Sequence, residues 1–117
     1  MPVKLTADGD KLTLLLSGEI DHHSSKEIRE EADACILKTH PKEIILDFKN
    51  VTFMDSSGIG LIMGRYRLAS SYGASVTVTE TSAYLKRVMR IAGIDSIVTI
   101  KQNSDLTKTN VPKEELN

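Results

Sequence analysis

EIILDFKNVTFMDSSGIGLIMGRYRLASSYGASVTVT, residues 43–79, is the stretch from which the fold of this chain can be predicted. The consecutive apolar residues Ile44, Ile45 and Leu46 within residues 43–48 are typical of a strand that is covered on both faces. The apolar residues that follow at helical spacing predict a helix with one buried face: Ile59, Ile62, Met63, Tyr66 and Ala69. Residues 75–79 alternate β-branched residues and predict a second strand. Strand–helix–strand order implies parallel pairing through a right-handed crossover.

Upstream of this unit, the sequence predicts a hairpin and a helix. Residues 3–7 and 12–16 alternate apolar and polar side chains on either side of Asp8-Gly9-Asp10, which has the composition of a turn. Ser24 and Glu27 form a capping-box pattern that predicts the start of a helix. The helix should end near His40-Pro41, because proline disfavours helical geometry in the residue before it.

Downstream, one more helix and strand complete the domain. Thr81 or Ser82 can cap a third helix that stops at Gly93, and residues 97–100 predict a last strand. The apolar residues of this third helix are Tyr84, Leu85, Val88, Ile91 and Ala92. We therefore expect an α/β domain over residues 1–101, with a mixed sheet of about five strands that opens with the hairpin. Residues 102–117 are predicted to be a polar, mobile tail to which we assign no chemistry.

Composition excludes several functional classes. The 117 residues include 15 basic and 16 acidic side chains, and this balance argues against nucleic acid as a partner. Cys35 is the single cysteine, so no intrachain disulfide can form. The chain has no signal-peptide pattern and no run of about 20 apolar residues, so we expect a cytoplasmic protein with no membrane contact.

The first candidate site is the run Asp55-Ser56-Ser57-Gly58 between the central strand and the second helix. The carboxyl end of a strand in an open parallel sheet is a common place for function. A helix N-terminus there favours an anion, so the helix could tolerate a phosphate on Ser56. The alternative interpretation is that Asp and Ser merely cap the helix.

The second candidate site is GEIDHH, residues 18–23, which we expect in the loop after the hairpin and near the first site. Its acidic residues, Glu19 and Asp21, could instead only complement a helix N-terminus. Metal binding by His22, His23 and His40 is not expected, because their spacing does not match known zinc sites.

Five basic residues on the second and third helices are either solvated or docking charges for an acidic partner: Arg65, Arg67, Lys86, Arg87 and Arg90. A catalytic serine or histidine finds little support, because no nucleophile elbow surrounds the serines. The P-loop pattern is absent, and Gly58, Gly60 and Gly64 resemble a phosphate-binding loop only loosely. Nucleotide binding therefore stays open as an alternative.

The run VTFMDSSGIGLIMGRYRLASSYGASVTV, residues 51–78, resembles the anti-anti-sigma factors built on the STAS domain, and GEIDHH is similar to their second motif. The resemblance covers roughly residues 3–100 and assigns residues 1–101 to one STAS domain. It implies a regulatory protein with no enzyme activity and no cofactor, which we expect to be monomeric when free.

The resemblance also implies a partner-switching mechanism. The unphosphorylated protein would bind an anti-sigma factor that is also a serine kinase, and would thereby release the sporulation sigma factor F. The kinase, with its own ATP and magnesium, would phosphorylate Ser56, and a serine phosphatase would reverse the reaction.

The same resemblance assigns roles to individual residues. Glu19, Asp21 and Arg65 would contact the kinase. Asp55, Ser57 and Gly58 would shape the serine loop and complete the partner-binding set. Stress-response members of the family share the phosphoserine loop and are an alternative, but the paired histidines favour the sporulation members.

Overall fold

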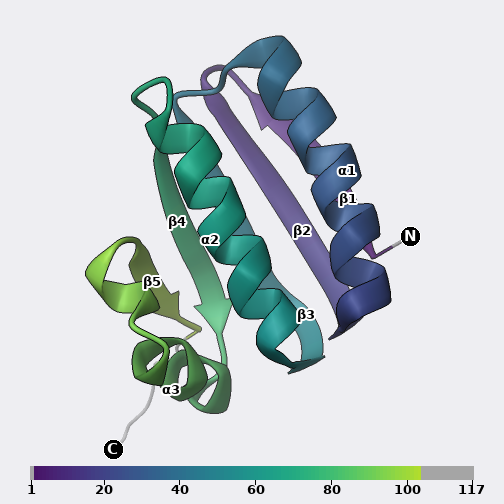
Figure 1. Cartoon of the computed structure of the whole chain (residues 1–117), viewed down its shortest axis with the longest axis vertical. Coiled ribbons are helices and arrows are strands. Elements are labelled where there is room, and N and C mark those ends of the chain that lie inside the picture. Colours follow the sequence, from purple (N-terminus) through teal and green to yellow (C-terminus); the bar gives the residue numbers. More distant parts are fainter. Residues whose placement is uncertain (1, 104–117) are drawn as a thin grey trace, which may run out of the picture.

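The computed structural model describes residues 2–103, which form one mixed sheet with helices packed against it (Figure 1). The sheet has the strand order β1-β2-β3-β4-β5; β1 pairs antiparallel with β2, and all other pairs are parallel. The elements are, in chain order, β1 (Val3–Asp8), β2 (Lys11–Ile20), α1 (His22–Thr39), β3 (Glu43–Met54), α2 (Ser56–Ser70), β4 (Ser75–Thr81), α3 (Ala83–Ile91), the short 3-10 helix η1 (Ile94–Ser96) and β5 (Thr99–Gln102). The predicted α/β class, N-terminal hairpin and parallel repeats are confirmed.

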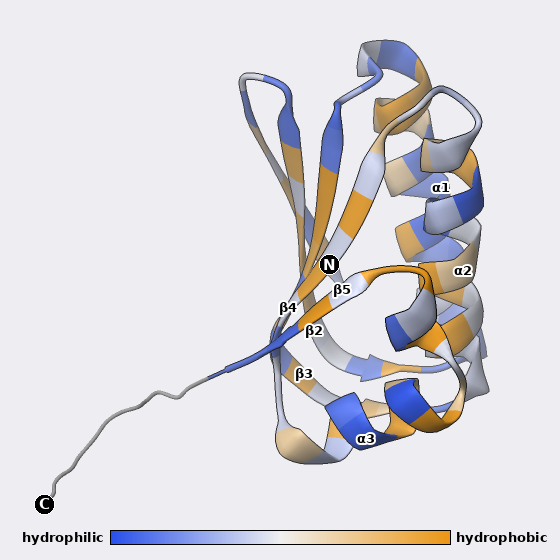
Figure 2. Ribbon diagram, turned by 90° about the vertical axis from the view of Figure 1, so that its left-hand side faces the viewer, coloured by the Kyte–Doolittle hydropathy of each residue, from blue (hydrophilic) through white to orange (hydrophobic). Residues whose placement is uncertain are grey.

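Only one face of the sheet is covered by the long helices. Successive strands lie side by side in chain order, so right-handed crossovers carry α1 and α2 to the same side (Figure 2). Accordingly, Ile44 and Leu46 are buried beneath the helices, whereas Ile45 is only half-buried on the opposite face. The prediction that this strand is covered on both faces was wrong. Three consecutive apolar residues do not reveal on which side of the sheet the crossover helices lie.

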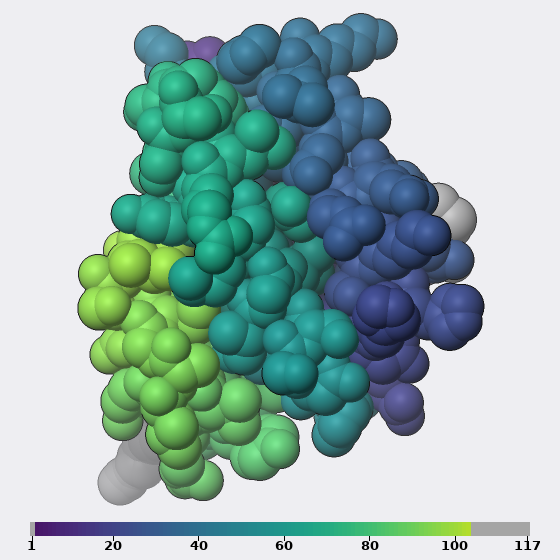
Figure 3. Space-filling view, viewed as in Figure 1, coloured from purple at the N-terminus to yellow at the C-terminus, as the bar shows by residue number. Residues whose placement is uncertain are grey.

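The core lies between the sheet and the helices. It is built from alternate residues of β2 and β3 and from one stripe of each helix: Leu12, Leu14, Leu16, Ile28, Ala32, Ile36, Ile44, Leu46, Phe48, Leu61, Ile62, Leu85 and Met89. In the space-filling view, α1, α2 and the α3 segment lie next to one another across the face that they cover (Figure 3).

Two helices are rotated from their predicted orientation. The buried residues of α2 are Gly58, Leu61, Ile62, Arg65 and Ala69, and the predicted Ile59, Met63 and Tyr66 are only half-buried. In α3, Leu85 and Met89 are buried, whereas Tyr84 and Ile91 are exposed. The spacing of apolar residues predicted that these helices form, but it did not predict which side of each helix faces the sheet.

Element boundaries shift by a few residues. Helix α1 begins at His22 with Asp21 as its N-cap, so Ser24 is not the cap, and the predicted Glu27 takes no part in the capping box. Ser82 caps α3, and Gly93 follows it with a positive φ of 82°. Ile97 and Val98 precede β5, which extends to Gln102, one residue into the predicted tail. Residues 104–117 of that tail lie outside the described residues.

Candidate functional site

The two candidate motifs lie at the same edge of the sheet, where β2 and β3 end. Glu19 pairs with Phe53 and Ile20 with Met54, and the Asp55 amide donates to the Ile20 carbonyl oxygen at 3.2 Å. The predicted proximity of the motifs is therefore confirmed. The prediction of a loop over residues 18–23 was wrong, because β2 continues to Ile20 and pairs with β3 up to that residue. The register of this pairing shifts next to Gly18, whose φ is 79°.

Asp21 is the only residue between β2 and α1, and its carboxylate caps the helix. The Ser24 amide donates to Asp21 Oδ1 at 2.9 Å, and the Asp21 amide donates back to Ser24 Oγ at 3.0 Å. Ser24 Oγ in turn donates to the Glu19 carbonyl oxygen at 2.9 Å. The hydrogen bond from the Ser24 amide holds the pKa of Asp21 below its ordinary value of 3.8. Glu19 itself is exposed, so both acidic side chains of this motif border solvent at the strand end.

Asp55 is the N-cap of α2 and follows the end of β3 directly. Its Oδ1 accepts a hydrogen bond from the Ser57 amide at 2.7 Å. Ser56 is the first residue of α2 and is exposed, whereas Ser57 is half-buried. The two adjacent hydroxyl-bearing residues thus lie in different surroundings.

Gly58 is required by the packing beneath this helix start. A Cβ atom at Gly58 would collide with Cγ and Sδ of the buried Met54 side chain. Gly60 and Gly64, by contrast, have open space where a Cβ atom would be. All three glycines lie inside α2, and this placement differs from a glycine-rich loop that precedes a helix and wraps a phosphate.

Arg65 is a buried charge between α1 and α2. It is 4% exposed, and its Nε lies 2.9 Å from Asp33 Oδ1 while Nη2 donates to Asp33 Oδ2 at 3.2 Å. Burial lowers the pKa of the Arg65 guanidinium, and the Asp33 carboxylate partly offsets this effect. Burial also raises the pKa of Asp33, against the opposing charges of Arg65 and Arg29. The predicted contact of Arg65 with a partner therefore stays a prediction, and within the chain this residue ties the two helices together.

A cleft between α1 and α2 opens beside the serine motif and has a volume of about 250 Å³. We call it the α1–α2 cleft, and it is lined by His22, Ser25, Arg29, Ser57, Gly60, Leu61 and Arg65. Ser57 contributes to this lining and Ser56 does not. Sequence reasoning missed Arg29 and Asp33, because only the packing of α1 on α2 brings them to Arg65.

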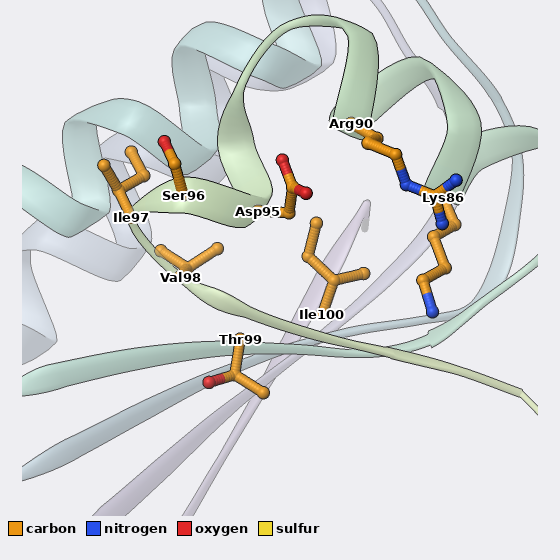
Figure 4. Close-up of a pocket in the computed structure, with 8 residues that line it drawn as sticks. All are labelled: Lys86, Arg90, Asp95, Ser96, Ile97, Val98, Thr99 and Ile100. Carbon is orange, nitrogen blue, oxygen red and sulfur yellow. The ribbon is translucent and has the colours of Figure 1, made fainter.

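A second hollow, of about 540 Å³, lies between α3, η1 and β5 (Figure 4). Lys86 and Arg90 of α3 extend along one side of it, and Asp95 of η1 lies across from Arg90. Neither candidate motif contributes a residue to it. Lys86 and Arg90, two of the five basic residues singled out in the sequence, are therefore separate from the serine site.

The three histidines do not form a cluster. His22 and His23 begin α1, whereas His40 follows its last residue and packs its ring against Tyr72. Within residues 2–103, no three His, Cys, Asp or Glu side chains gather in a way that could hold a metal ion. None of the helices described in this range is long and apolar enough to cross a membrane.

The fold and the site define a class of protein: a small α/β domain that presents a capped serine pair at the edge of its sheet. The STAS domain model matches residues 2–106, and the chain belongs to the STAS domain family. Within that family, it groups with the anti-sigma factor antagonists.

Three comparisons support this grouping. The chain is 38% identical over 92 residues to the anti-sigma F factor antagonist of Paenibacillus polymyxa, covering 79% of each chain. It is 29% identical over 90 residues to the anti-sigma-B factor antagonist of Bacillus subtilis (strain 168), covering 77% of this chain and 81% of the relative. It is also similar to the solved structure of the Bacillus cell fate determinant SpoIIAA in the phosphorylated form, with a TM-score of 0.70 and 26% identity, covering 89% of this chain and 94% of the other.

Proposed function

We propose that this protein is a phosphorylation-controlled antagonist of an anti-sigma factor that is also a serine kinase. In its unphosphorylated form it binds this kinase and releases the sporulation sigma factor F, and phosphorylation of Ser56 ends the binding. The kinase brings its own ATP and magnesium, a serine phosphatase restores the active form, and the free protein is a monomer. The protein itself acts as a substrate and a binding module.

The observation that carries the proposal is the environment of Ser56. It is exposed at the first position of α2, where a kinase can reach it and where the positive end of the helix dipole favours an anion. Adjacent Ser57 is half-buried and lines the α1–α2 cleft. A phosphorylated form of a structurally similar antagonist, SpoIIAA, supports the same modification in this chain.

The proposed partner surface surrounds Ser56 at the sheet edge. Glu19 and Asp21 lie at the end of β2, which pairs with β3 up to Met54. Asp55 and Ser57 begin α2, and Gly58 lets the helix start lie close to Met54. A phosphate of about −1.5 to −2 charge in the middle of this surface would be buried without a counter-charge when the partner docks. Loss of about 3 kcal/mol would weaken binding more than a hundredfold.

A stress-response role is the second candidate, because the anti-sigma-B factor antagonist of Bacillus subtilis is also a relative. Greater identity to an anti-sigma F factor antagonist favours the sporulation role. Binding of the two kinds of anti-sigma factor to the purified chain separates the two roles.

The decisive experiment measures phosphorylation and binding together. Incubation with the anti-sigma kinase and ATP should add one phosphate, about 80 Da by intact mass. Ser56→Ala should abolish this gain, and the matched variant Ser57→Ala should keep it. In a binding assay, Ser56→Asp should weaken the complex while Ser56→Ala retains it. Loss of phosphorylation in Ser57→Ala alone would place the site on the wrong serine, and equal affinities of Ser56→Asp and Ser56→Ala would contradict the electrostatic switch.

A further inference from the structure

The α1–α2 cleft contains a buried positive charge whose hydrogen-bonding capacity is not fully used. Nε and Nη2 of Arg65 face the carboxylate of Asp33. Nη1 is buried and has no hydrogen-bond partner among the described residues. A guanidinium N–H that is removed from water and left unpaired carries a free-energy cost that a bound acceptor would relieve.

The charges around the cleft favour an anion. Arg29 lies one helical turn before Asp33 on α1, and it lines the cleft together with Arg65. No carboxylate is part of the cleft lining, and Asp33 beside it neutralises only one of the two guanidinium groups. At neutral pH, the Arg29–Arg65–Asp33 group therefore keeps a net positive charge.

The starts of α1 and α2 lie beside the cleft, but its positive charge comes from the two arginines. His22 and Ser25 belong to the first residues of α1, and Ser57 is the second residue of α2. Both helices therefore begin at the same end of the cleft, where the Asp21 and Asp55 carboxylates cap them and offset the partial positive charge of the helix starts. The feature that favours an anion in this cleft is therefore the buried, unpaired guanidinium N–H of Arg65 beside the exposed Arg29.

We propose that the α1–α2 cleft is a binding site for a single phosphate-like oxyanion, either free or as a small monoester. Arg65 Nη1 and Arg29 supply the positive charge, and the hydroxyl of Ser57 is a further donor. The volume of about 250 Å³ is below the range of about 300–1,000 Å³ that is usual for drug-sized ligands, so the site suits one small group. This site is independent of the proposed phosphorylation of Ser56, which does not line the cleft.

Nuclear magnetic resonance of the full chain tests the proposal. Inorganic phosphate should cause saturable shifts in the amide signals of Ser57, Gly60 and Ser25, whereas sodium chloride at matched ionic strength should not. A parallel titration with methyl phosphate distinguishes the two sources: saturation by both assigns the site to monoesters as well as free phosphate, and saturation by inorganic phosphate alone assigns it to the free ion.

Two arginine variants make the test specific. Arg29→Ala changes an exposed residue and should leave the fold intact while weakening phosphate binding about tenfold. The matched control Arg67→Ala removes an exposed arginine of α2 that is outside the cleft lining, and its affinity should stay unchanged. Non-saturable shifts, an equal loss in both variants, or acetate binding as tight as phosphate binding would each overturn the proposal.

Discussion

At the scale of single residues, the ion pair of buried Arg65 with Asp33 joins α1 to α2. Removing one partner of a buried ion pair costs more than the pair itself contributes, because the other charge stays buried. We therefore expect Asp33→Ala to lower the free energy of unfolding by about 3 kcal/mol, measured by urea denaturation. The double variant Asp33→Leu/Arg65→Met should regain most of this loss. A double variant that is no more stable than Asp33→Ala would contradict this expectation and show that the pair is a net source of stability.

The Asp21 carboxylate makes the stability of the protein depend on pH. Its pKa is lowered in the folded protein because the Ser24 amide stabilises the ionised form. A carboxyl with a lowered folded pKa contributes stability above its unfolded pKa, and this contribution is lost as pH falls through the folded value. Asn is also a good N-cap, so Asp21→Asn removes only the charge. The stability advantage of the wild type over Asp21→Asn should shrink as pH falls below 3.8, and an advantage independent of pH would contradict this assignment.

At the scale of the element, the packing of α2 requires a glycine at position 58 but not at positions 60 and 64. Gly58→Ala adds a methyl group against Met54, and overpacking of this kind costs about 1–3 kcal/mol, which equals or exceeds the helical gain of about 1 kcal/mol from alanine. The matched variant Gly64→Ala meets open space and should stabilise the protein by about 1 kcal/mol. Thermal denaturation of both variants measures the difference, and a stabilised Gly58→Ala would show that Met54 moves aside easily.

The same helix shows what the sequence could and could not predict. Its start was predicted because Asp55 and Ser56 are local capping signals. Its buried face was predicted only in part: Ile62 and Ala69 are buried, but Arg65 takes the place of an apolar residue at a core position and depends on Asp33, which is distant in the sequence. Similarly, a loop was predicted at the end of β2, because Gly18 and Glu19 are residue types that are common in loops. Their place in a strand depends on pairing with β3, which the local sequence does not show.

At the scale of the whole molecule, the parallel strands set the place of the candidate site more firmly than any motif. Carboxyl ends of parallel neighbours meet at one edge, so the ends of β2 and β3 come together whatever residues occupy them. This is why the proximity of residues 18–23 to the serine motif could be predicted from element order. The α1–α2 cleft could not, because it depends on how two helices pack side chain against side chain.

This arrangement also predicts how far the effect of phosphorylation reaches. Ser56 is exposed and at a helix start that can accommodate negative charge, so a phosphate there needs no rearrangement of the core. We expect phosphorylated and unphosphorylated proteins to differ in amide chemical shifts only near the ends of β2 and β3 and the start of α2. The hairpin turn around Gly9 lies at the other end of β2 and serves as an internal control, because its signals should not move. Shifts that spread to this turn would mean that the phosphate acts by changing the fold, and the switch would then not be the local electrostatic one that the exposed serine favours.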